Sequence, residues 1–155
     1  MAGEQGARIA FIETEGWDTH ANQRGALNLR LRNLDALLAS LKSGLGSEWS
    51  STLVIVATEF GRTAAPNGTG GTDHGTASAA MMLGGAVAGG RVVADWPGLS
   101  RAQLYEGRDL KPTTALDALI AGALAQHYGF ESGRALSLLF PDAPQAAWSG
   151  ALLKA

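Results

Sequence analysis

Residues 52–58 read Thr-Leu-Val-Ile-Val-Ala-Thr, and this apolar, β-branched run decides the predicted fold. A continuous apolar run is typical of a central strand that helices cover on both faces. Residues 8–13, Arg-Ile-Ala-Phe-Ile-Glu, predict a second buried strand. Between the two runs, from about Asn22 to Lys42, leucines recur at helical spacing. We therefore expect a parallel, right-handed βαβ unit.

The rest of the chain extends this pattern. Residues 79–83 and 91–94 predict two short strands. A helix is expected from a capping box at about Thr114 to Tyr128, and residues 135–140 predict a short last helix. The predicted fold class is α/β, with a mostly parallel sheet flanked by helices, in a single domain that spans residues 1–155.

The composition limits the classes of function. The net charge of -2, with no basic run, gives no electrostatic footprint for nucleic acid or an anionic membrane, so neither partner is expected. No run of about 18 apolar residues predicts a membrane span. The chain contains no cysteine, which excludes disulfides, thiolate metal sites and a cysteine nucleophile. Any metal ion must be held by oxygen and imidazole ligands.

Two clusters of Asp and His follow predicted strands. The sequence GWDTH ends at His20, and GTDHG lies in the long loop after the central strand. Ligands of open α/β sheets bind at the carboxyl ends of the strands, so we expect both clusters at one site. Carboxylates and imidazoles suit zinc, manganese or iron. The predicted metal ligands are Asp18, His20, Asp73 and His74.

Each cluster also has a purely structural interpretation. Asp18 and His20 can form a hydrogen bond that orders the turn, and Asp73 can form an Asx-type turn beside an exposed His74. The third histidine, His127, is expected near a helix end, where a cation complements the helix dipole. Two clusters in one small chain favour the metal site.

Two charged residues after the central strand are candidates for catalysis. Glu59 occupies a position from which catalytic carboxylates project in α/β sheets, and Arg62 can clamp an anionic substrate oxygen. A salt bridge between them is the alternative. No Gly-x-Ser-x-Gly elbow occurs, and Ser78, near His74, lacks such a setting, so a serine triad has little support.

The order of these motifs resembles a known family. GWDTH, then ATEFGRT at residues 57–63, then the stretch from Asn67 to Gly75, then two glycine pairs are similar to the carboxyl-terminal half of exported bacterial proteins called domain of unknown function 1501. That group is similar to the alkaline phosphatase, arylsulfatase and phosphoglycerate mutase superfamily, which hydrolyses or transfers phosphate and sulfate esters at one or two metal ions. The resemblance implies an alkaline phosphatase-like half-domain, an anionic small-molecule ester as substrate, and an exported or periplasmic location.

The resemblance also implies roles for individual residues. It assigns Asp18, His20 and His74 to a first divalent ion, zinc or manganese. The position of a second ion reads Glu59-Phe60 in this chain, so only Glu59 is suited to that role. Asp73 is either a ligand or the partner that orients an imidazole.

The chain departs from the superfamily in one respect. The nucleophile of the superfamily lies in an amino-terminal half that this sequence does not contain. The sequence also shows no signal peptide and enters its first predicted strand at about Arg8. Three interpretations of the chain remain open. It is a fragment of a longer exported protein, a short form that binds a metal and a ligand without turnover, or a form that another chain completes.

We expect a metal-dependent hydrolase-like domain that acts on phosphate or sulfate esters. A non-catalytic metal- or ligand-binding domain and a carboxylesterase that uses Ser78 are the alternatives. Unpaired sheet edges are prone to pairing with a second chain, so a homodimer is possible.

Overall fold

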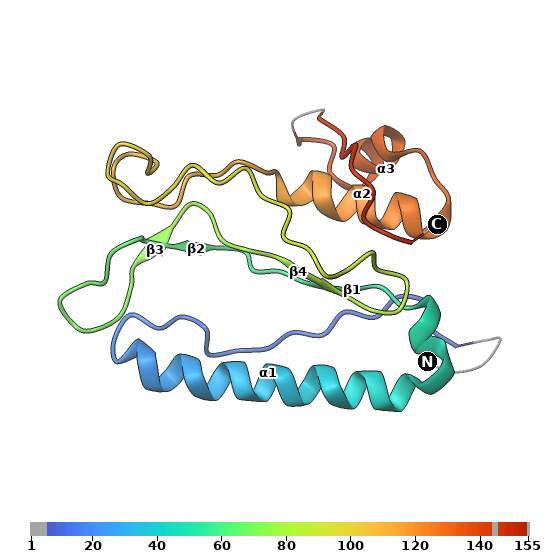
Figure 1. Ribbon diagram of the computed structural model, residues 1–155, viewed down its shortest axis with the longest axis horizontal. Helices are drawn as coiled ribbons and strands as arrows, with labels where there is room; N and C mark the ends of the chain where they lie inside the picture. The colour runs from blue at the N-terminus through green and yellow to red at the C-terminus, as the bar shows by residue number, and fades with distance from the viewer. Residues whose placement is uncertain (1–5, 144–145, 155) are drawn as a thin grey trace.

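In the computed structural model, which describes residues 6–143 and 146–154, short strands lie between one long helix and a pair of shorter helices (Figure 1). The elements in chain order are α1 Gln23–Leu45, the 3-10 helix η1 Gly46–Ser51, β1 Val54–Val56, β2 Gly61–Arg62, β3 His74–Gly75, β4 Met81–Leu83, α2 Leu116–Tyr128 and α3 Ser132–Leu139. No helix in the described part of the chain is long and apolar enough to cross a membrane.

The strands form two sheets within the described residues, each antiparallel and two-stranded. Ile55 of β1 lies opposite Met82 of β4, and Arg62 of β2 lies opposite His74 of β3. The predicted parallel sheet flanked by helices, and the alkaline phosphatase-like half-domain with it, is therefore wrong. After β1 the chain turns back through the β2–β3 ribbon and passes β1 in the opposite direction, so the partner of β1 is antiparallel.

Two predicted strands do not form. Residues 8–13 and 91–94 belong to no sheet in the structure. The side chain of Phe11 is 91% exposed, and Ile9 and Val92 are also exposed. An apolar run becomes a strand only where a neighbouring strand satisfies its backbone groups, and neither segment has such a neighbour among the described residues.

The helix predictions are confirmed in position but not in every detail. Helix α1 covers the predicted range, although none of its residues is buried. Helix α2 ends at Gly129, which adopts the left-handed conformation (φ 73°) that glycine allows at a helix end. The residue before α2 is Ala115, without a side-chain cap, so the predicted capping box is wrong. The predicted last helix is α3.

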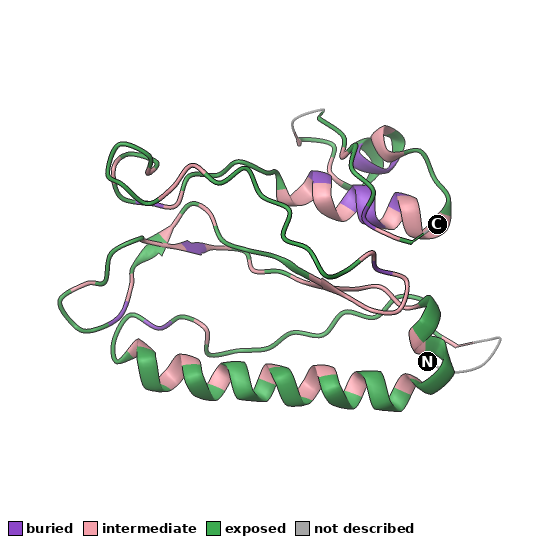
Figure 2. Cartoon of the chain, viewed as in Figure 1, coloured by how far each residue is buried: buried purple, intermediate pink, exposed green. Residues whose placement is uncertain are grey.

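The core lies where α2 and α3 pack together, at the opposite end of the molecule from the β2–β3 ribbon (Figure 2). Helix α3 starts at a side-chain cap, because the Glu131 carboxylate accepts hydrogen bonds from the N–H groups of Gly133 and Arg134. The cluster consists of Ala121, Ala125, Ala135 and Leu136, with Phe140 and Ala143 packed against it. Small residues let the two helices approach closely, and Leu136 is the only large side chain of the cluster that is fully buried.

Two leucines of α3 allow a matched test of this core. Leu136 is 1% exposed and Leu138 is 72% exposed. We expect Leu136→Ala to lower the free energy of unfolding by roughly 2–5 kcal/mol, because it removes buried apolar contacts and leaves a cavity. Leu138→Ala should change it by less than about 0.5 kcal/mol. Urea denaturation followed by circular dichroism measures both, and equal effects of the two substitutions would contradict this location of the core.

Candidate metal centre

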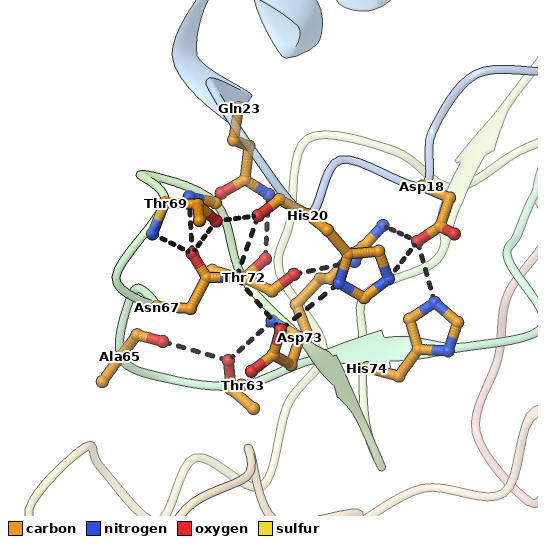
Figure 3. Close-up of polar contacts among 12 residues, drawn as sticks. Asp18, His20, Gln23, Thr63, Ala65, Asn67, Thr69, Thr72, Asp73 and His74 are labelled. Atoms are coloured by element: carbon orange, nitrogen blue, oxygen red, sulfur yellow. Dashed lines mark hydrogen bonds and ion pairs between the residues drawn. The ribbon is translucent and has the colours of Figure 1, made fainter.

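A single carboxylate oxygen gathers side chains from both Asp/His clusters. Asp18 Oδ1 lies 2.9 Å from His20 Nε2 and 2.8 Å from His74 Nε2 (Figure 3). One candidate ligand atom from each of these three residues lies within 4.8 Å of the other two. The structure thus brings the His74 imidazole to the Asp18 carboxylate and the His20 imidazole, which lie more than 50 residues earlier in the sequence.

The first cluster lies on a segment without regular secondary structure that leads into α1. Thr19 is buried, whereas Asp18 and His20 on either side of it are exposed. This alternation of burial is the pattern of side chains that point to opposite sides of the chain, so the two outer residues share one side. The Asp-x-His spacing therefore suits a shared ligand position.

The second cluster reaches the first through close backbone contacts. Gly71 is buried against the main chain of His20, and any Cβ at this position would collide with the His20 carbonyl group. The N–H groups of Asn22 and Gln23, at the start of α1, donate to the carbonyl oxygens of Thr69 (3.2 Å) and Gly70 (3.0 Å). The loop therefore satisfies part of the open helix end and is held beside it.

Arg62 joins the two clusters from β2. Its Nη2 donates to Asp18 Oδ1 at 2.9 Å and to the Trp17 carbonyl at 2.7 Å, and its Nη1 donates to the Thr72 carbonyl at 3.0 Å. One guanidinium group thus ties the main chain of both loops to the shared carboxylate.

An aromatic ring supports the same arrangement. Phe60 stacks on the His74 imidazole, with ring centroids 4.6 Å apart and planes 12° apart. The Arg62 guanidinium lies 4.7 Å from the centroid of the same ring. Stacking of this kind limits the directions in which the imidazole can turn.

Asp73 faces the Nδ1 atom of the His20 ring. Its Oδ1 is 3.3 Å from His20 Nδ1, on the ring nitrogen that does not face Asp18. The structure thus gives His20 one carboxylate at each ring nitrogen. Asp73 is not one of the three residues whose ligand atoms converge.

Hydrogen bonds lower the pKa of both carboxyl groups. The hydrogen bond with His74, helped by Arg62, lowers the pKa of the Asp18 carboxyl below its ordinary value. The hydrogen bond from Asn67, followed by that of His20, lowers the pKa of Asp73 in the same way. Both groups are therefore negatively charged near neutral pH and suited to a cation.

Glu59, Ser78 and His127 are not among the three residues whose ligand atoms converge. Glu59 is exposed and makes no hydrogen bond or ion pair with the described residues, so the alternative salt bridge with Arg62 does not form. Ser78 is also exposed, without a hydrogen bond to either histidine of the cluster. His127 lies in α2, where it contacts the Tyr128 ring edge-on.

Two residues that form hydrogen bonds near the candidate site, Asn67 and Asp109, were not assigned a role from the sequence. Asn67 contacts both loops through its side-chain amide. Asp109 is buried and accepts a hydrogen bond from the Thr76 hydroxyl at 2.9 Å, next to β3. Arg108 Nη2 donates a hydrogen bond to Asp109 Oδ2 at 3.1 Å, and Arg108 Nε lies 2.8 Å from Asp109 Oδ1 as an ion pair. An Asn-Gly pair signals only a turn, and a lone Asp in a polar loop gives no signal at all.

The chain matches one described family. The family described as "Protein of unknown function (DUF1501)" matches residues 1–139, which is most of the chain. No curated protein and no solved structure matches it.

The buried carboxylate of Asp109 leads to a prediction about pH. The hydrogen bond from Arg108, followed by that from Thr76, lowers the pKa of Asp109 below its ordinary value of 3.8. A carboxyl whose pKa is lower in the folded state stabilises the fold above its unfolded pKa, and this contribution is lost as the pH falls through the folded pKa. Asp109→Asn should lower the free energy of unfolding at pH 7 by roughly 1–3 kcal/mol.

The difference in the free energy of unfolding between the wild type and Asp109→Asn should become smaller as the pH falls below 3.8. Urea denaturation at pH 7 and at successively lower pH measures it. Asp35→Asn is the matched control, because Asp35 lies exposed on α1. A difference that stays constant with pH would show that the charge of Asp109 does not stabilise the fold.

Proposed function

We propose that this chain, which belongs to the DUF1501 family, binds one divalent cation through Asp18, His20 and His74 and hydrolyses phosphate or sulfate esters at that site. The observation that carries the proposal is the convergence of both histidine Nε2 atoms on one oxygen of Asp18. Two imidazoles and a carboxylate form a ligand set used by catalytic zinc, and manganese accepts the same donors. The chemistry of the donor set therefore fits a divalent cation.

The exposure of the ligands supports a catalytic site over a purely structural one. The side chains of Asp18, His20 and His74 are 54%, 47% and 54% exposed. Structural zinc sites are closed by four protein ligands, whereas catalytic sites have three and leave a position open. A cation held here would polarise an ester oxygen and lower the pKa of a bound water molecule.

The neighbouring residues hold the ligands in place. Arg62 fixes the Asp18 carboxylate, Phe60 covers one face of the His74 ring, and Asp73 faces His20 Nδ1. Partners of this kind orient ligands and limit the loss of entropy on binding. The exposed carboxylate of Glu59 is the candidate for a base or a second ligand.

A specific observation favours a second candidate function. The Arg62 guanidinium donates to three oxygen atoms of the protein itself, so it already has partners in place of a substrate anion. Among the described residues, Glu59 makes no hydrogen bond or ion pair with the cluster. A domain that binds a metal ion or ligand without turnover is therefore the alternative. Ester hydrolysis is supported by the resemblance of the motif series to DUF1501 proteins, a group that is similar to alkaline phosphatases and sulfatases.

Metal analysis tests the ligand set. Purified protein incubated with Zn²⁺ or Mn²⁺ and then desalted should carry about one ion per chain. His20→Ala and His74→Ala should each weaken binding by at least about 100-fold, since even residues that only orient a ligand contribute about 10- to 100-fold. His127→Ala is the matched control, because His127 lies in α2, outside the cluster. Stoichiometric metal in both cluster variants would show that the site is wrong.

A substrate screen separates hydrolysis from binding alone. Phosphate monoesters and diesters, sulfate esters and carboxyl esters are offered to the metal-loaded protein and to a metal-stripped control. We expect hydrolysis of a phosphate or sulfate ester that is lost on metal removal and in His74→Ala. Ser78→Ala should retain full activity. If no ester is hydrolysed above the metal-stripped control, the alternative of binding without turnover stands instead.

A further inference from the structure

Asn67 uses both ends of its side-chain amide. Its Nδ2 donates to Asp73 Oδ1 at 3.0 Å and to the His20 carbonyl at 2.9 Å (Figure 3). Its Oδ1 accepts hydrogen bonds from the N–H groups of Thr69 and Gly71, both at 3.0 Å, and from the Thr69 hydroxyl at 2.8 Å. The amide nitrogen thus contacts Asp73 and the main chain of His20, while the amide oxygen holds the loop at Thr69 and Gly71.

The contacts of the amide nitrogen continue to the His20 ring. The same Asp73 Oδ1 that accepts from Asn67 lies 3.3 Å from His20 Nδ1. The opposite ring nitrogen, Nε2, lies 2.9 Å from Asp18. A carboxylate held at Nδ1 fixes the ring so that Nε2 is directed towards the shared ligand position. The hydrogen bond to the His20 carbonyl holds the main chain of the same residue.

We propose that Asn67 is the positioning residue of the metal centre, and that its amide nitrogen sets the direction of the His20 imidazole through Asp73 and through the His20 carbonyl. This inference rests on the proposed metal site. It assigns a role in that site to a residue that is not itself a ligand. Only an amide supplies both the donors towards Asp73 and His20 and the acceptor for the loop, because aspartate lacks the donors and alanine lacks both.

A double-mutant cycle with Co²⁺ as the probe tests the inference. Co²⁺ binding to the full chain is followed by titration and by its visible absorption spectrum, which depends on the geometry of the ligands. Asn67→Ala should weaken binding by about 10- to 100-fold and change the spectrum. In an Asp73→Ala background the same substitution should have a smaller effect, because the contact between Asn67 and Asp73 is already missing and only the hydrogen bond to the His20 carbonyl is left to lose. Asn28→Ala, at an exposed position of α1, is the control for an Asn-to-Ala change.

The variant Asn67→Asp separates the donor role of the amide nitrogen from the acceptor role of the amide oxygen. It retains an acceptor oxygen for Thr69 and Gly71 but lacks the donors towards Asp73 and His20. Its Co²⁺ spectrum should therefore differ from that of the wild type even where its thermal unfolding is unchanged. This variant tests the inference if Asn67→Ala fails to fold.

The outcomes distinguish this inference from the proposed function. If His20→Ala abolishes Co²⁺ binding while Asn67→Ala and Asn67→Asp keep the wild-type affinity and spectrum, the positioning role is overturned and the metal site stands. Equal losses from Asn67→Ala with and without Asp73 would also overturn it, since Asn67 would then not act through Asp73. If the wild type binds neither Co²⁺ nor Zn²⁺, the proposed function fails, and the positioning role fails with it.

Discussion

The Asp18 carboxylate is the point on which the candidate centre depends, because three nitrogen atoms from three different residues meet at its Oδ1. These side chains are largely exposed, apart from the partly buried Arg62, and exposed ion pairs are individually weak because water screens them. The arrangement must therefore be held by the main chain beneath it. The close approach of Gly71 to His20, and the hydrogen bonds from the start of α1 to the loop, provide that support.

The division between core and site has a consequence for local stability. The best-buried side chains lie between α2 and α3, whereas the cluster lies at the other end of the molecule on short strands and loops. Segments with few buried apolar contacts open at lower free energy than the core. Ligands that bind only the ordered state stabilise it, so a cation at the cluster would order both loops. Local order at this end and metal binding are then linked, while the α2–α3 core contributes its stability independently.

Part of this structure could be predicted from the sequence. Residue type and loop position identified the two Asp/His clusters, the family resemblance selected Asp18, His20 and His74 from them, and leucine spacing located α1. The sheet could not be predicted, because the apolar run at residues 52–58 has the same pattern whether its partner is parallel or antiparallel. The run at residues 8–13 is equally apolar but remains outside any sheet in the structure. Strand formation depends on a partner far away in the sequence, and local patterns do not contain that information.

The roles of Asn67 and Asp73 also depend on distant contacts, and the geometry distinguishes the two roles predicted for Asp73. The two nitrogens of an imidazole point in different directions. A carboxylate at His20 Nδ1 is therefore directed away from an ion at Nε2, and Asp73 lies at Nδ1. Its second hydrogen bond, from Asn67, holds it there. Because one carboxylate, Asp18, faces Nε2 and the other faces Nδ1, the position of Asp73 favours the orienting role over direct ligation.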